Sequence, residues 1–330
     1  MTLNIIMGGM NISRRAALTA PLLLAAPALA QGRPMRLIVA SAAGANADVV
    51  ARLLAVEAED TLARRILVEK MPAASGMRAV EAVAAAAPDG ETLLFGTASQ
   101  LVMNLALFPN PAVDVTTAIR GIAMVNRVPM VLCVAGTDPA RSLAELLGRL
   151  RGGGPVQYGS GPIGTTTHIV GARFVEQAGL ARGDLVHAPY PSSAQALTDL
   201  MAGRLTFMFD AAVTALPHHR AGRIRILGVA AETRLPAAPD LPTMIEAGME
   251  GFTGSTWNSI AGPMALPPAR LAALAEGFNA ALTRPALRRR LAEMGSELPD
   301  GQPSPAEVDA FYARERDIWL PLLRTTPMRG

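Results

Sequence analysis

Small uncharged side chains fill four loops of this sequence, and they suggest a site for a weakly charged ligand. The loops are SAAGAN (41–46), TAS (97–99), GSGPIGTTT (159–167) and the residues that follow the run ending at Asp210, AAVT (211–214). None of them contains Lys or Arg. The neutral donors in these loops include Ser41, Asn46, Thr97, Ser99, Ser160, Thr165, Thr166 and Thr167. Any single one of these residues is adequately explained as a helix N-cap. The prediction therefore depends on the recurrence of the same residue types in all four loops.

Each loop separates an apolar run from a following stretch that can form a helix, and this order predicts its position. Apolar runs at 36–40, 91–96, 156–160, 205–210 and 223–231 are expected to be strands. Strands that alternate with helices predict a parallel or mixed sheet of the α/β class. In open sheets of this class, ligands bind at the carboxyl ends of the strands. There the free N–H groups of a helix N-terminus suit a carboxylate.

The first predicted helix, Ala47–Glu59, has an apolar face that should pack on the sheet. Its members are Val49, Val50, Leu53, Leu54 and Val56. The last ninety or so residues are expected to be mainly helical, with prolines at helix starts and stops.

Two aspartates need separate treatment. Asp48 lies in the first turn of its predicted helix, where a carboxylate interacts favourably with the helix dipole, and this favours a structural role. Asp210 ends a strand, where its carboxylate would face the crevice. It could accept a hydrogen bond from a ligand amine or hydroxyl, or it could brace a loop, and the sequence leaves both open.

The usual catalytic and metal-binding patterns are poorly represented. Ser160 lies in a Gly-Ser-Gly stretch that lacks the full G-x-S-x-G motif, with His168 eight residues on. His218 and His219 are adjacent, so their side chains diverge on a helix, and His187 has no carboxylate at ligand spacing. Neither G-x-G-x-x-G nor a P-loop occurs. We therefore expect no enzyme, no metal and no cofactor.

Composition narrows the class of protein further. The 330 residues are 50% hydrophobic and 17% charged, which is enough to bury a large core. The formal charge is +3, and loss of the two arginines in residues 1–30 would leave +1, so a nucleic-acid partner is not expected. Cys133 is the single cysteine and lies in an apolar run, which predicts a buried small side chain rather than a disulfide.

The N-terminal residues have the features of an export signal. Arg14 and Arg15 precede an apolar stretch, 16–26, and Ala28-Leu29-Ala30 offers a cleavage site. We expect residues 1–30 to be removed and the mature chain, which begins near Gln31, to work outside the cytoplasm. The sequence leaves the Sec and Tat routes open. No cysteine follows the cleavage site, so a lipid anchor is not expected.

Taken in order, several longer segments resemble the Bug family of periplasmic solute receptors, the substrate-binding proteins of tripartite tricarboxylate transporters. They are RPMRLIVASAAGANADVVARLLA, PDGETLLFGTAS, VQYGSGPIGTTTHIVGARF, VHAPYPSSAQALTDLMAGRLTFMFDAAVTALPH and AAETRLPAAPDLPTMIEAGMEGF. The resemblance covers nearly all of residues 31–325.

This resemblance implies a two-lobed α/β fold of the periplasmic-binding-protein type (type II) with a central ligand cleft. One lobe would comprise 31–127 and 253–330, and the other 128–252. The implied ligand is a small carboxylate, and the implied partners are the permease subunits of the transporter, with the receptor acting as a monomer. The residues implied to bind the ligand are Ser41, Gly44, Asn46, Asp48, Thr97, Ser99, Ser160, Gly164, Thr165, His168, Tyr190, Ser193 and Asp210.

Three departures from the family pattern remove polarity or rigidity from the predicted site. Residues 41–45 replace a Phe-Pro-Pro-Gly-Gly type loop, Ile163 stands where a side-chain amide is usual, and Ala211 replaces a common Asn. They predict a ligand with an apolar or aromatic portion beside one carboxylate. A ligand sensor that docks on a signalling partner, and a cleft enzyme, remain the alternatives.

Overall fold

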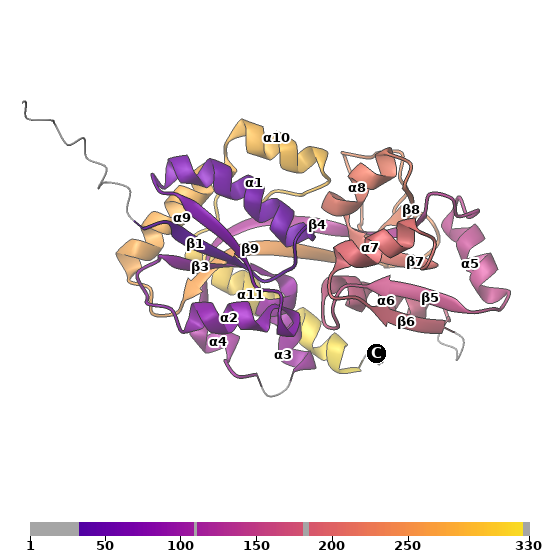
Figure 1. Ribbon diagram of the computed structural model, residues 1–330, viewed down its shortest axis with the longest axis horizontal. Coiled ribbons are helices and arrows are strands. Elements are labelled where there is room, and N and C mark those ends of the chain that lie inside the picture. Colours follow the sequence, from indigo (N-terminus) through magenta and orange to yellow (C-terminus); the bar gives the residue numbers. More distant parts are fainter. Residues whose placement is uncertain (1–32, 109–110, 181–184, 326–330) are drawn as a thin grey trace, which may run out of the picture. The chain divides into compact units, whose positions relative to one another are not determined.

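A single mixed sheet organises the part of the chain that the computed structural model describes, residues 33–108, 111–180 and 185–325 (Figure 1). Its strands are β1 (Met35–Val39), β2 (Ile66–Lys70), β3 (Thr92–Thr97), β4 (Ile119–Ala135), β5 (Val156–Ser160), β6 (Leu185–Pro189), β7 (Phe207–Ala211), β8 (Ile224–Val229) and β9 (Ser255–Pro263). They lie in the order β2-β1-β3-β9-β4-β7-β5-β6, with β8 paired to β4. The predicted mixed α/β sheet is confirmed.

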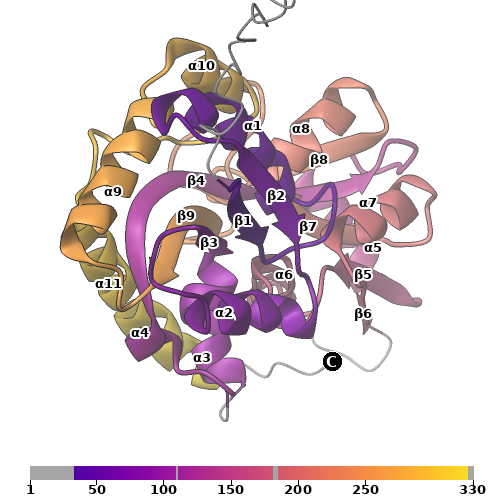
Figure 2. The ribbon, with the colours of Figure 1, turned by 60° about the vertical axis from the view of Figure 1, so that its left-hand side comes forward.

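Helices cover both faces of the sheet. They are α1 (Asn46–Thr61), α2 (Met77–Ala84), α3 (Asn104–Leu107), α4 (Val115–Ala118), α5 (Leu143–Arg151), α6 (Thr166–Gln177), α7 (Ser193–Met201), α8 (Ala212–Arg220), α9 (Pro268–Leu282), α10 (Pro285–Glu293) and α11 (Pro305–Thr325), with short turns η1 (Ala74–Gly76) and η2 (Ser99–Met103). Helices α1, α9 and α10 gather on one side of β1, β3 and β9, and α2 and α11 lie on the other (Figure 2).

Strands β4 and β9 connect the two halves of the sheet. The first part of β4, Ile119–Pro129, pairs antiparallel with β9, and β9 in turn pairs with β3. The second part, Met130–Ala135, pairs with β7 and β8. A 17-residue strand therefore belongs to both halves, and the predicted lobe boundary at 127/128 falls inside it. The lobe limits themselves stay a prediction.

The buried face of α1 differs in one member from the predicted face. Val50 and Leu54 are fully buried, and Val49 and Leu53 are half-buried, as expected. Val56 is 70% exposed, so its assignment to the apolar face was wrong. The reason is helix geometry, because a residue two positions after Leu54 points about 200° around the axis from it.

Helices α9, α10 and α11 are the main elements of the last ninety residues, as expected, but strand β9 was missed. Its polar residues are buried, which hid the strand in the sequence. The Nδ2 of Asn258 donates to Asn126 Oδ1, and the Oγ of Ser259 donates to the Ala123 carbonyl. These bonds satisfy the buried polar groups at the centre of the sheet. In the described residues, no helix is long and apolar enough to cross a membrane.

Candidate functional site

A cleft opens at the carboxyl ends of β1, β3, β5 and β7, where the sequence predicted a site. Its empty volume, counting the solvent at its mouth, is about 650 Å³. The residues that line it are Ala40, Ser41, Ala42, Ala45, Asn46, Ala47, Pro72, Ser75, Thr97, Ser99, Gln100, Met130, Gly161, Pro162, Thr165, Thr166, Thr167, Pro191, Ser192, Ser193, Asp210, Ala211 and Thr256.

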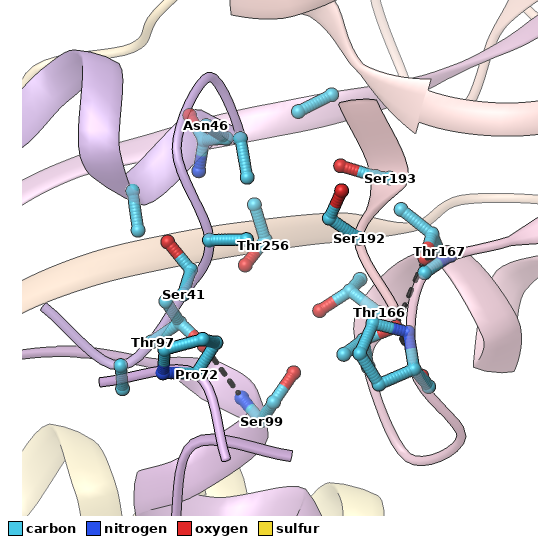
Figure 3. Close-up of a pocket in the computed structure, with 18 of the residues that line it drawn as sticks. Ser41, Asn46, Pro72, Thr97, Ser99, Thr166, Thr167, Ser192, Ser193 and Thr256 are labelled. Carbon is cyan, nitrogen blue, oxygen red and sulfur yellow. Dashed lines mark hydrogen bonds between the residues drawn. The ribbon is translucent and has the colours of Figure 1, made fainter. Parts of the chain in front are cut away.

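Two walls face each other across this cleft (Figure 3). Ser41, Thr97 and Ser99 lie on one wall, and Thr166, Thr167 and the two serines at the start of α7, Ser192 and Ser193, lie opposite. Each wall is a set of loops that follow strands, so the main chain as well as the side chains approaches the cleft. The two walls belong to the two halves of the sheet that β4 and β9 connect.

The loop between β1 and α1 supplies uncommitted hydrogen-bonding groups. The buried Ser41 Oγ has no hydrogen-bond partner. Helix α1 begins after Ala45, which has no side chain that can cap the first N–H groups. Those N–H groups are therefore available to a ligand anion. The Asn46 side chain contacts Asn258 Oδ1 through Nδ2 at 3.4 Å, which ties the start of α1 to strand β9.

The loop after β3 is held by its own side chains. Thr97 Oγ1 donates to Gln100 Oε1 at 2.7 Å, and the backbone N–H of Ser99 donates to Thr97 Oγ1. Gln100 also donates through Nε2 to the carbonyl of Ser75 at 3.0 Å, which links this loop to the turn after β2. The wall is therefore preorganised before any ligand arrives.

The opposite wall is built on the start of α6. The backbone N–H of Gly161 donates to Thr167 Oγ1 at 2.9 Å, and Thr165 Oγ1 donates to the carbonyl of Pro162. Thr165 precedes the helix but makes no capping hydrogen bond with its side chain. The first N–H groups of α6 are thus uncapped, as in α1, and the positive end of its dipole is at the cleft.

Asp210 is the one charged residue among the described residues that line the cleft. It is 1% exposed, and its Oδ2 accepts a hydrogen bond from Thr214 Oγ1 at 2.7 Å. Burial raises the pKa of the Asp210 carboxyl from 3.8 to about 6, although hydrogen bonds from Thr214, Ala211 and Ser193 oppose the shift. The carboxyl is therefore poised to take up a proton just below neutral pH.

The structure brings seven of the thirteen predicted site residues to the cleft. These are Ser41, Asn46, Thr97, Ser99, Thr165, Ser193 and Asp210. It places the other six outside the lining: Gly44, Asp48, Ser160, Gly164, His168 and Tyr190. Direct ligand contact by any of the thirteen stays a prediction.

The six residues outside the lining support the loops that form it. Asp48 accepts hydrogen bonds from the backbone N–H of Gly44 at 3.0 Å and from Arg52, which fixes the β1–α1 loop. The Tyr190 hydroxyl donates to Asp199 Oδ2 at 2.8 Å. Ile163, which the sequence suggested as an apolar site residue, is 40% exposed and outside the lining.

Ser160 contacts a histidine outside the lining of the cleft. Its Oγ lies 2.8 Å from His187 Nε2 and donates to the Gly161 carbonyl at 2.7 Å. Ser160 is fully buried, and His187 Nδ1 has no hydrogen-bond partner. Among the described residues, His187 Nδ1 thus lacks the carboxylate partner that orients the base of a catalytic triad. This contact positions the loop after β5.

Several lining residues escaped the sequence analysis. Pro72 and Ser75 follow β2 in a small-residue stretch, MPAASG, and the rule applied to the other strands would have found them. Met130 and Thr256 lie within β4 and β9. Met130 and Thr256 reach the cleft only because these two central strands pair with each other. No local sequence pattern therefore predicts these two residues.

Comparison with known proteins identifies the family. The sequence model of one protein family, the tripartite tricarboxylate transporter family receptor, matches residues 50–318 of this chain. A UPF0065 protein of Bordetella bronchiseptica is 30% identical over 321 residues, covering 96% of this chain and 94% of that protein.

Solved structures agree in fold and extent. The periplasmic binding protein BugD has a TM-score of 0.85 at 28% identity, with 90% of this chain and 98% of that one covered. MatC from Rhodopseudomonas palustris, with bound malate, has a TM-score of 0.82 at 28% sequence identity. The match covers 88% of this chain and 99% of MatC. R. palustris Rpa4515 with adipate has a TM-score of 0.83 at 27% sequence identity. The match covers 89% of this chain and 97% of Rpa4515. The predicted periplasmic-binding-protein fold is confirmed, and the chain belongs to the receptor family of the tripartite tricarboxylate transporters, that is, to the Bug and TctC type of solute-binding receptor.

Proposed function

We propose that this protein is a non-catalytic periplasmic receptor that captures a small organic carboxylate and delivers it to the permease subunits of a tripartite transporter. The observation that carries the proposal is the cleft, in which uncapped N-termini of α1 and α6 face each other across hydroxyl groups. Such groups bind an anion without a cation, so the ligand is held by many moderate hydrogen bonds and can be released. The receptor acts as a monomer, and the lobes 31–127 with 253–330 and 128–252 close on the ligand.

The ligand has an apolar portion beside its carboxylate. Ala42, Ala45, Met130, Pro162 and Ala211 contribute apolar surface between the donors. The malate and adipate in the two R. palustris structures support a small carboxylic acid, and adipate has an apolar chain of the kind that this surface suits.

A thermal-shift panel tests this function. Adipate and aromatic monocarboxylates are expected to raise the Tm, since a ligand at a hundredfold excess over its Kd stabilises the folded state by about 2.7 kcal/mol. Chloride at equal ionic strength is the control. Stabilisation by citrate-like polyanions alone would contradict the proposed ligand class. Turnover of a stabilising acid would contradict a receptor.

The charge of Asp210 predicts that the affinity for the ligand depends on pH. Between pH 8.0 and 6.0 a ligand carboxylate stays largely ionised, while the buried Asp210 begins to take up a proton because its pKa is raised to about 6. We expect adipate to bind about tenfold more tightly at pH 6.0, because the repulsion between two carboxylates is relieved. Isothermal titration calorimetry at the two pH values measures this change.

Asp210→Asn is the matched variant. It keeps the size of the side chain and removes its charge, so its affinity should be high at both pH values and independent of pH. If Asp210→Asn instead weakens binding at both pH values, Asp210 accepts a hydrogen bond from the ligand.

A further inference from the structure

Three buried asparagine amides form a chain of hydrogen bonds that leads from the ligand cleft into the centre of the sheet. Asn46 Nδ2 donates to Asn258 Oδ1 at 3.4 Å, and Asn258 Nδ2 donates to Asn126 Oδ1 at 2.6 Å. Asn126 Nδ2 in turn donates to Ser296 Oγ at 2.6 Å. The three asparagines are 9%, 0% and 1% exposed in this order. Each amide therefore donates through its nitrogen away from the cleft, which gives the chain one direction.

The chain begins at an acceptor that is not satisfied. Asn46 lines the ligand cleft, and its buried Oδ1 has no hydrogen-bond partner among the described residues (Figure 3). If the amide turned its nitrogen to the cleft instead, Asn258 Oδ1 would lose its donor, and a buried polar atom without a partner is unfavourable. Hydrogen bonds in a chain also polarise one another. Asn46 therefore presents an acceptor to the ligand rather than a donor.

The position of Asn46 limits which part of a ligand can reach this acceptor. Asn46 is the first residue of α1 and directly follows Ala45, which has no capping side chain. The free N–H groups that suit a ligand carboxylate belong to the same turn of the helix. A donor that reaches Asn46 Oδ1 must therefore lie close to the carboxylate, on the neighbouring carbon of the ligand.

A neutral hydroxyl group suits this place better than an ammonium group. The positive ends of the α1 and α6 dipoles are at the cleft, and they disfavour a cation beside them. The carboxyl of Asp210 also lines the cleft, but Thr214, Ala211 and Ser193 already donate hydrogen bonds to it. The unoccupied acceptor for a ligand hydroxyl is thus Asn46 Oδ1.

We propose that Asn46 makes the receptor selective for 2-hydroxy carboxylic acids. Its Oδ1 accepts a hydrogen bond from the hydroxyl group on the carbon next to the bound carboxylate, and Asn258 is the positioning residue that orients the Asn46 amide. The proposal rests on the proposed function and narrows it, because it names the class of acid that the receptor prefers. A site built to bond a hydroxyl discriminates against the analogue that lacks it, since the buried acceptor is then left unpaired.

Calorimetry at pH 8.0 tests the proposal with two pairs of acids that differ only in this hydroxyl group. The pairs are 2-hydroxyadipate with adipate and mandelate with phenylacetate, and each enantiomer of a hydroxy acid is measured separately. In the wild type, one enantiomer of the hydroxy acid is expected to bind about five- to tenfold more tightly than its partner acid, the effect of one net hydrogen bond.

Asn46→Ala should abolish this preference and leave the affinity for the acid without the hydroxyl nearly unchanged. Asn258→Ala should also reduce the preference, because Asn46 is then free to turn its nitrogen to the cleft. Asn46→Ala alone carries the test should Asn258→Ala fail to fold. The matched control is Asn104→Ala, which removes another buried Oδ1 without a partner among the described residues, outside the lining of the cleft. It should leave the ratio of the two Kd values within each pair unchanged.

The outcomes separate this selectivity from the receptor function. Equal Kd values within both pairs in the wild type, or a preference that persists in Asn46→Ala, would overturn the role of Asn46 and leave the carboxylate receptor intact. If none of the four acids binds, the proposed ligand class and the role of Asn46 both fail.

Discussion

Gly164→Ala is expected to weaken adipate binding by about tenfold or more, although Gly164 does not line the cleft. Its φ of +85° already disfavours any other residue. A Cβ built on Gly164 would lie 2.8 Å from Asn104 Oδ1 and 3.1 Å from Leu107 Cδ1. Both atoms belong to α3 on the opposite side of the cleft. The added methyl group would hold the two walls apart and so reduce the fraction of closed receptor.

Gly154→Ala separates this effect from backbone strain. Gly154 also has a positive φ, +101°, but a Cβ there would meet nothing within 4 Å. The positive φ alone should cost each variant roughly 1–2 kcal/mol of stability, which urea denaturation measures. Only Gly164→Ala should lose affinity by calorimetry. Equal affinities for adipate in the two variants would rule out contact across the cleft as the cause.

The strands that the sequence revealed share one local pattern. The runs that became β1, β3, β5, β7 and β8 are short and apolar, and the first four end in loops of small residues. This pattern depends only on neighbours in the chain. It also placed the cleft, since the carboxyl ends of such strands share an edge of the sheet.

Strands β4 and β9 could not be recognised in the same way. Asn126, Arg127 and Pro129 interrupt the apolar run of β4, and β9 carries Asn258 and Ser259 in its buried centre. Their polar groups are satisfied by partners more than fifty residues away, such as the pair Ser259 and Tyr312. A hydrogen bond of that kind exists only after folding, so no window of sequence contains it.

The same limit applies to the site residues. Ser41 and Thr97 reach the cleft because they lie at the carboxyl ends of β1 and β3. Ser160 and His168 have equally suitable side chains, but they turn inward to make a buried cluster. Residue type and spacing predicted the loops correctly, and side-chain direction within each loop required the packing of the whole sheet.

The buried cluster behind the cleft predicts that acid destabilises the protein. His168 and His187 stack with ring centroids 4.5 Å apart, and His187 stacks on Tyr158 at 4.7 Å. His168 Nδ1 accepts from the Gly164 backbone N–H at 3.3 Å, which holds the loop after β5. Burial lowers the pKa of both imidazoles from 6.5 to about 4, and for His168 the neighbouring His187 is a second, smaller cause of this shift.

These pKa shifts determine whether acid raises or lowers the free energy of unfolding, and over which pH range. The two histidines bind protons below about pH 6.5 in the unfolded chain but only below about pH 4 in the folded chain. The free energy of unfolding therefore falls as the pH drops from 6.5 to 4. For His168 alone the full loss is on the order of 3 kcal/mol. Asp210 acts in the opposite direction, since its raised pKa lets the folded state gain a proton between about pH 6 and 3.8. The net acid loss is therefore smaller than the contribution of the histidines.

His187→Phe isolates the contribution of the histidines. Phenylalanine can keep the stack on Tyr158, and Ser160 keeps its hydrogen bond to the Gly161 carbonyl. From pH 7 to pH 5, the free energy of unfolding in urea should fall about 1–2 kcal/mol less in this variant than in the wild type. Tyr158→Phe is the control, because burial raises the pKa of Tyr158 to about 12 and it does not titrate in this range. If all three proteins lose the same free energy, the acid loss arises elsewhere; a smaller loss in His187→Phe alone places it in the histidine stack that supports the cleft.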